Sequence, residues 1–88
     1  MSEAEIRTML VAALASASVF TLRDNGWTEA FLDGTRDVAL ADMEMDSLAV
    51  MELCIAVEVS ADVSIVPDEL EQIATLGGLV EAIRLGRG

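Results

Sequence analysis

The chain opens with a stretch in which apolar residues recur every three or four positions. Ser2, followed three residues later by Glu5, has the spacing of a capping box, which starts a helix. The apolar positions that follow lie on one face of a helix: Ile6, Met9, Leu10, Ala13, Leu14 and Ala17. This pattern predicts a first helix over residues 3–18, and we interpret residues 19–22 as its frayed end.

The helical spacing is lost over about residues 21–46, which we interpret as a long connection. Two turn dipeptides, Asn25-Gly26 and Asp33-Gly34, interrupt it, and residues 27–32 between them are compatible with one short helical turn. Connections of this length are uncommon in small domains and are often functional. We expect its apolar residues, with Trp27 as an anchor, to pin it to the helices: Trp27, Phe31, Leu32, Val38, Leu40 and Met43.

A second helical pattern begins after Asp46, a residue type that caps helices, and runs from residue 47 to about residue 59. One arc is apolar and is predicted to face the core: Val50, Leu53, Cys54, Ala56 and Val57. Another arc combines apolar residues with carboxylates: Leu48, Met51, Glu52, Ile55 and Glu58. Such a surface is typical of a docking site, but the long connection could equally cover it, and the pattern does not decide between the two.

Two shorter helices are predicted in the last third of the chain. Pro67 is favoured at a helix start, and the acidic residues after it suit a first turn, so we expect a helix from Pro67 through Ile73. Thr75 can cap a last helix with an inward apolar stripe: Leu76, Leu79, Val80 and Ile83. Gly86 ends this helix, and we expect residues 86–88 to form a disordered tail. Without repeats or a linker, residues 1–88 are interpreted as one domain.

Charge narrows the classes of partner. The net charge is −11, and sixteen carboxylates face five cations, all of them arginine. This balance disfavours nucleic acid and anionic membrane surfaces as partners, and it favours basic protein partners. No apolar run is long enough to insert in a membrane. Because the chain has no His and no Lys, it lacks most of the usual catalytic bases, which disfavours an autonomous enzyme.

The compartment is interpreted as the cytoplasm. The apolar stretch over residues 9–22 has some features of a signal peptide, but Glu3 and Glu5 precede it, where a signal peptide needs basic residues. Cys54 is the only cysteine and cannot form an internal disulfide, which fits a reducing compartment. We interpret it as a small core hydrophobe rather than a working thiol. We expect a monomer.

Ser47 is the leading candidate for chemistry. It follows Asp46 at a helix start, where backbone N–H groups and the positive end of the helix dipole favour an attached phosphate. A calcium loop is the competing interpretation, since Asp42, Glu44 and Asp46 have the first three ligand spacings. However, Ser47 stands where the sharp turn needs glycine, and Leu53 stands where a bidentate glutamate belongs. We therefore predict no metal site.

Several motifs at fixed distances resemble those of acyl carrier proteins and of the related peptidyl carrier proteins. Asp46-Ser47-Leu48 resembles the phosphopantetheine attachment motif of that superfamily. The flanking matches are Asp42-Met43 before it, Glu52-Leu53 after it, residues 65–69 around Pro67, and Thr75-Leu76 followed by Leu79 and Ile83. The resemblance covers essentially the whole chain.

The resemblance implies an all-α fold, a four-helix carrier-protein bundle with a long loop between helices 1 and 2. It also implies a non-catalytic, stand-alone carrier. A phosphopantetheinyl transferase would attach 4′-phosphopantetheine from coenzyme A to Ser47, with Asp46 as motif residue and helix cap. The arm would hold an acyl, aminoacyl or polyketide group as a thioester. The implied partners are an acyl or aminoacyl loading ligase, synthases and transferases with basic docking patches, which would contact Glu44, Leu48, Met51, Glu52, Ile55 and Glu58.

The sequence departs from the family pattern in two ways. Glu44 stands where glycine is frequent, which bears on the shape of the turn before Ser47. Ala49 replaces an acidic residue common in fatty-acid carriers, and Val59 and Ser60 stand where further acidic residues would follow. The second helix is therefore less acidic than in a general fatty-acid carrier, which favours a specialised biosynthetic pathway. The alternative function is a carrier-like protein–protein interaction module that is never modified.

Overall fold

The computed structural model describes residues 1–86, and within them the secondary structure is helical, with no strand. This confirms the predicted all-α class. The elements are α1 (Glu3–Ser16), α2 (Thr21–Asp24), α3 (Thr28–Leu32), the 3-10 helix η1 (Leu40–Met43), α4 (Ser47–Ala61), α5 (Pro67–Ile73) and α6 (Leu76–Arg84). Gly86 is a turn residue, and the rest of the predicted tail, residues 87–88, lies outside the described residues.

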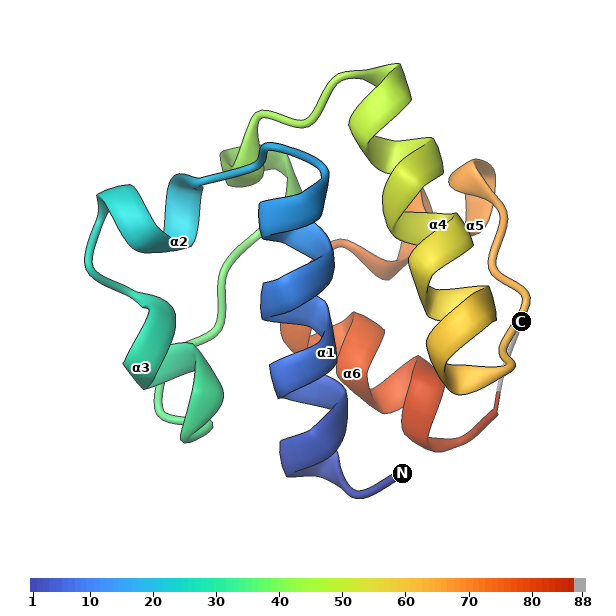
Figure 1. The fold of residues 1–88 in the computed structure, drawn as a ribbon, viewed down its shortest axis with the longest axis horizontal. Coiled ribbons are helices and arrows are strands. Elements are labelled where there is room, and N and C mark those ends of the chain that lie inside the picture. The colour runs from blue at the N-terminus through green and yellow to red at the C-terminus, as the bar shows by residue number, and fades with distance from the viewer. Residues whose placement is uncertain (87–88) are drawn as a thin grey trace.

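The four longer helices form the bundle, and α1 is at its centre. α1 packs against α4 and α6, while α5 packs against α4 and α6. Figure 1 shows α1 and α4 side by side, with α6 crossing behind them and α2 and α3 on the opposite side of α1 from α4. The start of α4 lies at one end of the bundle, at the top in this view.

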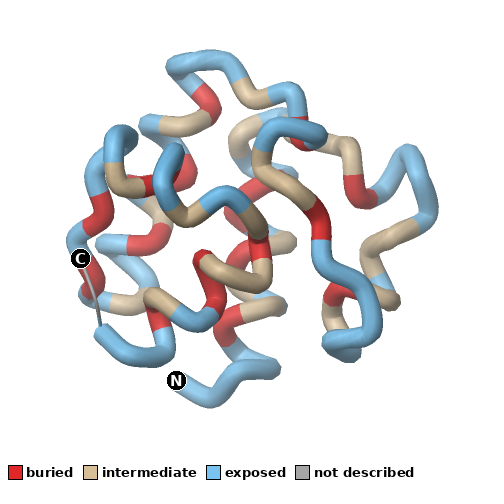
Figure 2. The backbone as a smooth tube through the Cα atoms, turned by 180° about the vertical axis from the view of Figure 1, so that it is seen from behind, coloured by how far each residue is buried: buried red, intermediate tan, exposed pale blue. Residues whose placement is uncertain are grey.

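The core is built from the inward stripes of the helices and from the long connection. Ile6 and Leu10 of α1, Leu53 of α4, and Leu76 and Leu79 of α6 are almost completely buried. Figure 2 shows these buried positions recurring between exposed ones along the helices. The connection adds its own buried residues, Leu22, Phe31, Val38 and Met43. The expectation that apolar residues pin the connection is therefore confirmed for three of them, while Trp27, Leu32 and Leu40 are half-buried.

Three helix starts agree with the predicted caps. The Glu5 N–H donates to Ser2 Oγ (3.2 Å), and the Ser2 N–H donates to Glu5 Oε1 (3.0 Å), so both halves of the capping box form. At α6 the Gly78 N–H donates to Thr75 Oγ1 (2.9 Å). Each contact satisfies an N–H group that has no acceptor within the helix.

The structure differs from the sequence prediction at three places. α1 ends at Ser16 rather than residue 18, because Ser18 takes a left-handed conformation (φ 61°) that breaks the helix. Residues 21 and 22 are not a frayed end, since a new helix, α2, begins at Thr21 and buries Leu22. α4 continues two residues beyond the predicted end, to Ala61, and stops where Asp62 turns left-handed (φ 57°).

The end of the connection is fastened to the start of α6 by Asp37. Its Oδ1 accepts from the N–H groups of Val38 (2.8 Å) and Gly77 (2.7 Å). A Cβ atom on residue 77 would lie 2.7 Å from Asp37 Oδ2, so any side chain there would displace the Asp37 carboxylate. Burial alone would raise the pKa of Asp37, but the hydrogen bonds from Gly77, Thr75 and Val38 outweigh it and lower that pKa below its ordinary value.

Candidate functional site

The start of α4 is organised by Asp46. Asp46 has extended backbone geometry, and its Oδ1 accepts a hydrogen bond from the Ala49 N–H (2.8 Å), so the predicted helix cap is present. Ser47 is the first helical residue and is exposed. Its hydroxyl therefore projects from the end of α4, where the first N–H groups of a helix have no helical acceptor.

The turn that leads into this helix has an unusual backbone conformation. Glu44, which follows η1, is left-handed (φ 55°, ψ 40°), a conformation that glycine adopts readily and other residues only at a cost. The turn is also tied to α2, because Thr21 Oγ1 donates to the carbonyl of Met43 (3.0 Å). The short helix α2, which sequence reasoning missed, thus helps to fix the approach to Ser47.

A groove of about 720 Å³ opens beside Ser47, and we call it the site groove. Three segments form it: residues 39–41 with Met45, the first turn of α4, and α5 with Ala74. Apolar side chains form most of its wall, including Leu40, Val50, Met51 and Leu70, while Asp46 and Glu71 also line it. Sequence reasoning did not find this groove. The only signal was the set of small residues, alanines 39, 41 and 74, which leave room for it.

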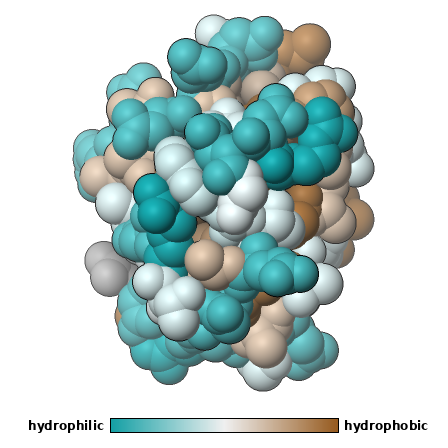
Figure 3. Space-filling view, turned by 90° about the vertical axis from the view of Figure 1, so that its left-hand side faces the viewer, coloured by the Kyte–Doolittle hydropathy of each residue, from teal (hydrophilic) through white to brown (hydrophobic). Residues whose placement is uncertain are grey.

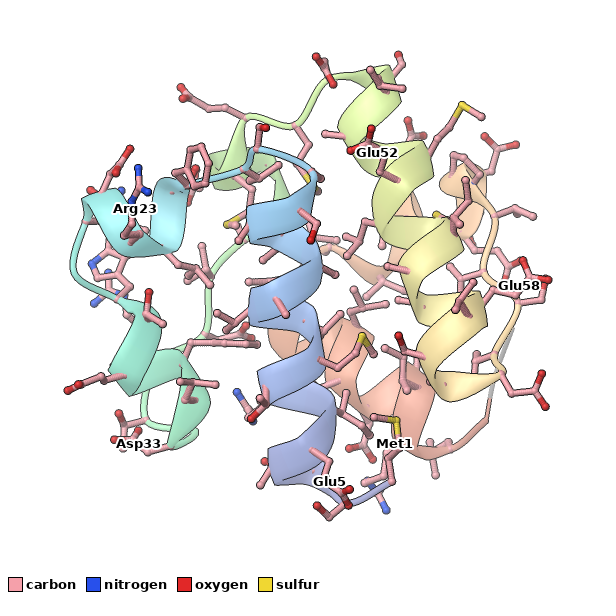
Figure 4. All side chains as sticks on the ribbon, in the orientation of Figure 1. Met1, Glu5, Arg23, Asp33, Glu52 and Glu58 are labelled. Carbon is pink, nitrogen blue, oxygen red and sulfur yellow. The ribbon has the colours of Figure 1, made fainter. Side chains whose placement is uncertain are left out.

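The mixed arc of α4 is exposed. Leu48, Met51 and Ile55 are 65%, 53% and 56% exposed, and Glu44, Glu52 and Glu58 are also exposed. The connection packs against α1 instead, so it does not cover this face. Figure 4 shows Glu52 on the side of α4 that faces α1 and Glu58 on the opposite side. The apolar residues of the arc therefore lie between Glu52 on one side and Glu58 on the other.

Cys54 points away from this surface and into the core. It is 9% exposed. Burial raises the pKa of its thiol, and the nearby negative charge of Glu69 raises it further, so the thiol stays protonated at neutral pH. This placement agrees with its interpretation as a core residue.

Other kinds of site find no support among residues 1–86. No group of three or more His, Cys, Asp or Glu side chains is placed to hold a metal ion there. The Asp46 carboxylate, third in the calcium-like spacing, is engaged as the cap of α4. Within the same residues, every helix is too short or too polar to cross a membrane.

Comparison with protein families agrees with this geometry. A family model described as the phosphopantetheine attachment site (PP-binding) matches residues 30–83, from α3 to the last turn of α6. Since the match covers more than half of the chain, the protein belongs to this family of carrier domains. Neither a curated protein nor a solved structure matches the chain significantly.

Membership of this family determines the general chemistry. PP-binding domains carry covalently attached 4′-phosphopantetheine, and they are carriers rather than enzymes. They are modified by a phosphopantetheinyl transferase and interact with biosynthetic enzymes. The predicted resemblance, cofactor and non-catalytic role are thereby confirmed.

Proposed function

We propose that this protein carries an acyl, aminoacyl or polyketide intermediate on a 4′-phosphopantetheine arm attached to Ser47, in a specialised biosynthetic pathway. One observation carries the assignment of the residue. Ser47 is an exposed hydroxyl on the first residue of α4, within Asp46-Ser47-Leu48 and inside the matched segment. We also propose that the protein acts as a monomer in the cytoplasm.

The residues around Ser47 fit a phosphate-linked arm. A phosphodiester on the hydroxyl would lie at the N-terminus of α4, where the helix dipole and unsatisfied N–H groups favour negative charge. Asp46 keeps this end of the helix in place through its bond to Ala49. The site groove begins at the same residue and offers apolar walls to a group held nearby. When bound, the arm supplies the terminal thiol that holds the cargo as a thioester.

The chemistry of attachment belongs to the transferase. The Ser47 oxygen bonds to the phosphorus that carries the pantetheine arm of coenzyme A, and adenosine 3′,5′-bisphosphate leaves. The hydroxyl proton passes to a base on the transferase, because this chain has no histidine or lysine. Ser47 is thus the acceptor of the group and not a catalytic residue.

Charge and exposure support basic partners at this end of the molecule. Residues 37–83 contain eleven carboxylates and no cation. Complementary basic surfaces on a loading ligase, synthases and transferases would be steered toward this region. We propose that these enzymes contact the face formed by Glu44, Leu48, Met51, Glu52, Ile55 and Glu58.

Mass spectrometry tests the assignment of Ser47. Incubation with coenzyme A, Mg²⁺ and a broad-specificity phosphopantetheinyl transferase should add one pantetheine arm to the protein. Ser47→Ala should abolish the addition and leave the helical circular dichroism spectrum intact, since the side chain is exposed. Ser60→Ala, an exposed serine near the other end of α4, is the matched control and should be modified normally. An unchanged mass of the native chain would support the alternative function, an unmodified interaction module.

A further inference from the structure

A second groove lies at the far half of α4, away from Ser47. It has a volume of about 400 Å³ and runs between α1 and α4, and we call it the α1–α4 groove. Ala13 and Ala17 of α1 form one wall, and Ile55, Ala56 and Val59 of α4 form the other. Small side chains line much of it, so another helix could approach closely.

The rims of this groove are exposed and largely uncharged. Val59 is 80% exposed and Ile55 56%, which are high values for large apolar residues. On α1, Ala12 and Ala15 are exposed next to the buried stripe, and no charged residue occurs between Arg7 and Arg23. An apolar surface of this kind marks an interaction site more often than free solvent contact.

Distance separates this groove from the attachment site. Val59 follows Ser47 by twelve residues, which corresponds to about 18 Å along a helix. A partner seated between α1 and the end of α4 therefore leaves the Ser47 end of the bundle uncovered.

The charges around the α1–α4 groove indicate which kind of partner would bind there. Glu52 lines the groove on the α1 side, and Glu58 flanks the exposed stripe on its other side (Figure 4). A second copy of this chain would bring the same carboxylates together and add its own net charge of −11, which opposes self-association. A helix with an apolar face and lysine or arginine at its flanks would instead complement both the apolar lining of the groove and the negative charge beside it.

We propose that the α1–α4 groove is a second docking surface, which binds an amphipathic helix with basic flanks from a partner protein. Such a helix would leave Ser47 itself uncovered, but it would share Glu52, Ile55 and Glu58 with the enzymes that contact the face around Ser47, so helix and enzyme would bind one at a time. The proposal goes beyond the carrier function, and binding in this groove does not require Ser47 to be modified.

A model peptide tests it directly. The probe is a synthetic helical peptide with a leucine and alanine face flanked by lysines, and its partner is a scrambled peptide of the same composition. Titrated into the ¹⁵N-labelled chain, the helical peptide should shift the amide signals of Ala13, Ala17, Ile55 and Val59. The scrambled peptide should produce much smaller shifts at these residues.

Matched variants locate the binding surface. Val59→Ser should weaken binding about tenfold, because it removes one well-exposed apolar contact. Val66→Ser changes the same residue type at an exposed position outside the groove, and it should bind like the native chain. Both side chains are largely exposed, so both variants should fold.

Three outcomes would overturn the proposal. The first is a set of shifts centred on Leu48 and Met51, which would place the helix at the Ser47 end. The second is concentration-dependent dimerisation in sedimentation experiments with the contact in this groove, which would make a second copy the occupant. The third is equal affinity of the peptide for the native chain and for Val59→Ser, which would show that Val59 takes no part in binding. Because Ser47→Ala should still bind the peptide, failure of the carrier function and failure of this proposal are separable.

Discussion

Residues 1–36 and residues 37–83 use charge in different ways. The first region has five carboxylates and three arginines, and each arginine stacks on an aromatic ring: Arg7 on Phe31 at 4.9 Å, Arg23 on Phe20 at 4.1 Å and Arg36 on Trp27 at 4.1 Å. These rings are all the aromatic residues of the chain. The second region has eleven carboxylates and no cation, and within residues 1–86 only its Glu81 forms an ion pair, with Arg84.

In the first region charged groups contact other parts of the protein, whereas in the second region most of them face solvent. In the first region, Arg7 fastens the connection to α1, whereas Arg23 and Arg36 stack on rings next to or within the connection. The face that carries α2 and α3 is mostly hydrophilic (Figure 3). In the second region, most carboxylates are exposed without a cationic neighbour of their own, from Asp42, Glu44 and Asp46 beside Ser47 to Glu58 and Asp62 at the other end of α4. Charges that contribute little inside the protein are available to a partner, which agrees with the docking face proposed above.

The largest loss of folding stability is expected on substitution of Arg7. Its side chain is only 12% exposed, donates from Nη1 to the Phe31 carbonyl (2.8 Å) and from Nε to Glu3 (3.1 Å), and covers the Phe31 ring. Arg7→Ala removes one donor from the Phe31 carbonyl, which keeps the Gly34 N–H (3.1 Å), and it uncovers the Phe31 ring, so unfolding should require about 2 kcal/mol less free energy. Urea titration measures this.

Arg23→Ala is the control for that prediction. Arg23 also stacks on a ring and pairs with a carboxylate, but its side chain is 68% exposed. Its removal should change the stability only slightly. If both variants lost the same free energy of unfolding, the hydrogen bond from Arg7 to the Phe31 carbonyl would contribute nothing to stability. Arg7 would then not hold the connection against α1.

Asp37 is the carboxylate of the second region that acts internally, and Asp37→Ala should cost about 1–2 kcal/mol at neutral pH. Its folded pKa lies below the ordinary value of 3.8, so its contribution is complete above that pH and is lost as the pH falls through the folded pKa. The native and Asp37→Ala proteins should therefore converge in stability as the pH falls below the folded pKa of Asp37, as followed by thermal melts across pH.

Gly77→Ala provides a second test of the same contact. In the native chain the added methyl group would displace Asp37, whereas in the Asp37→Ala background it has room. The two substitutions should therefore be less than additive in urea titration. Strict additivity would show that Asp37 does not hold the start of α6.

A smaller difference between the two regions is expected in how NaCl changes the melting temperature. Exposed like charges at close range destabilise the folded state, and added salt screens them. The melting temperature at pH 7 should rise with NaCl, and Glu58→Gln in the second region should reduce that rise. Glu29→Gln, in the first region, should leave it nearly unchanged. A melting temperature indifferent to NaCl in all three proteins would mean that the carboxylates of the second region are too far apart to repel.

The smallest effect is expected at Glu44. Its left-handed conformation costs a residue with a side chain about 1–2 kcal/mol, while glycine in the same place loses more chain entropy on folding. Glu44→Gly should thus raise the stability by less than about 1 kcal/mol. Glu44→Gln removes the charge but keeps the conformation. If both variants gain equally in thermal melts, the gain comes from charge and not from the backbone.

The parts of the fold that the sequence predicted were set by local signals. Ser2, Asp46 and Thr75 each cap a helix through residues within one turn, and Pro67 starts α5. The helices α2 and α3 were missed or reduced to a turn because helices of four and five residues are unstable alone and depend on burying Leu22 and Phe31. Ser47 was found from its motif, but the site groove and the α1–α4 groove are each formed by segments that are distant in the sequence.

The placement of Cys54 has a practical consequence for following the carrier in solution. The chain has a single cysteine, and its thiol is buried within α4 with a raised pKa, so maleimide reagents should react with it slowly. The thiol at the end of an attached arm would be exposed and would react fast. A fluorescent maleimide would therefore label the modified protein and lose its target when cargo occupies the arm. Native protein, with no cysteine removed, would serve as its own loading sensor.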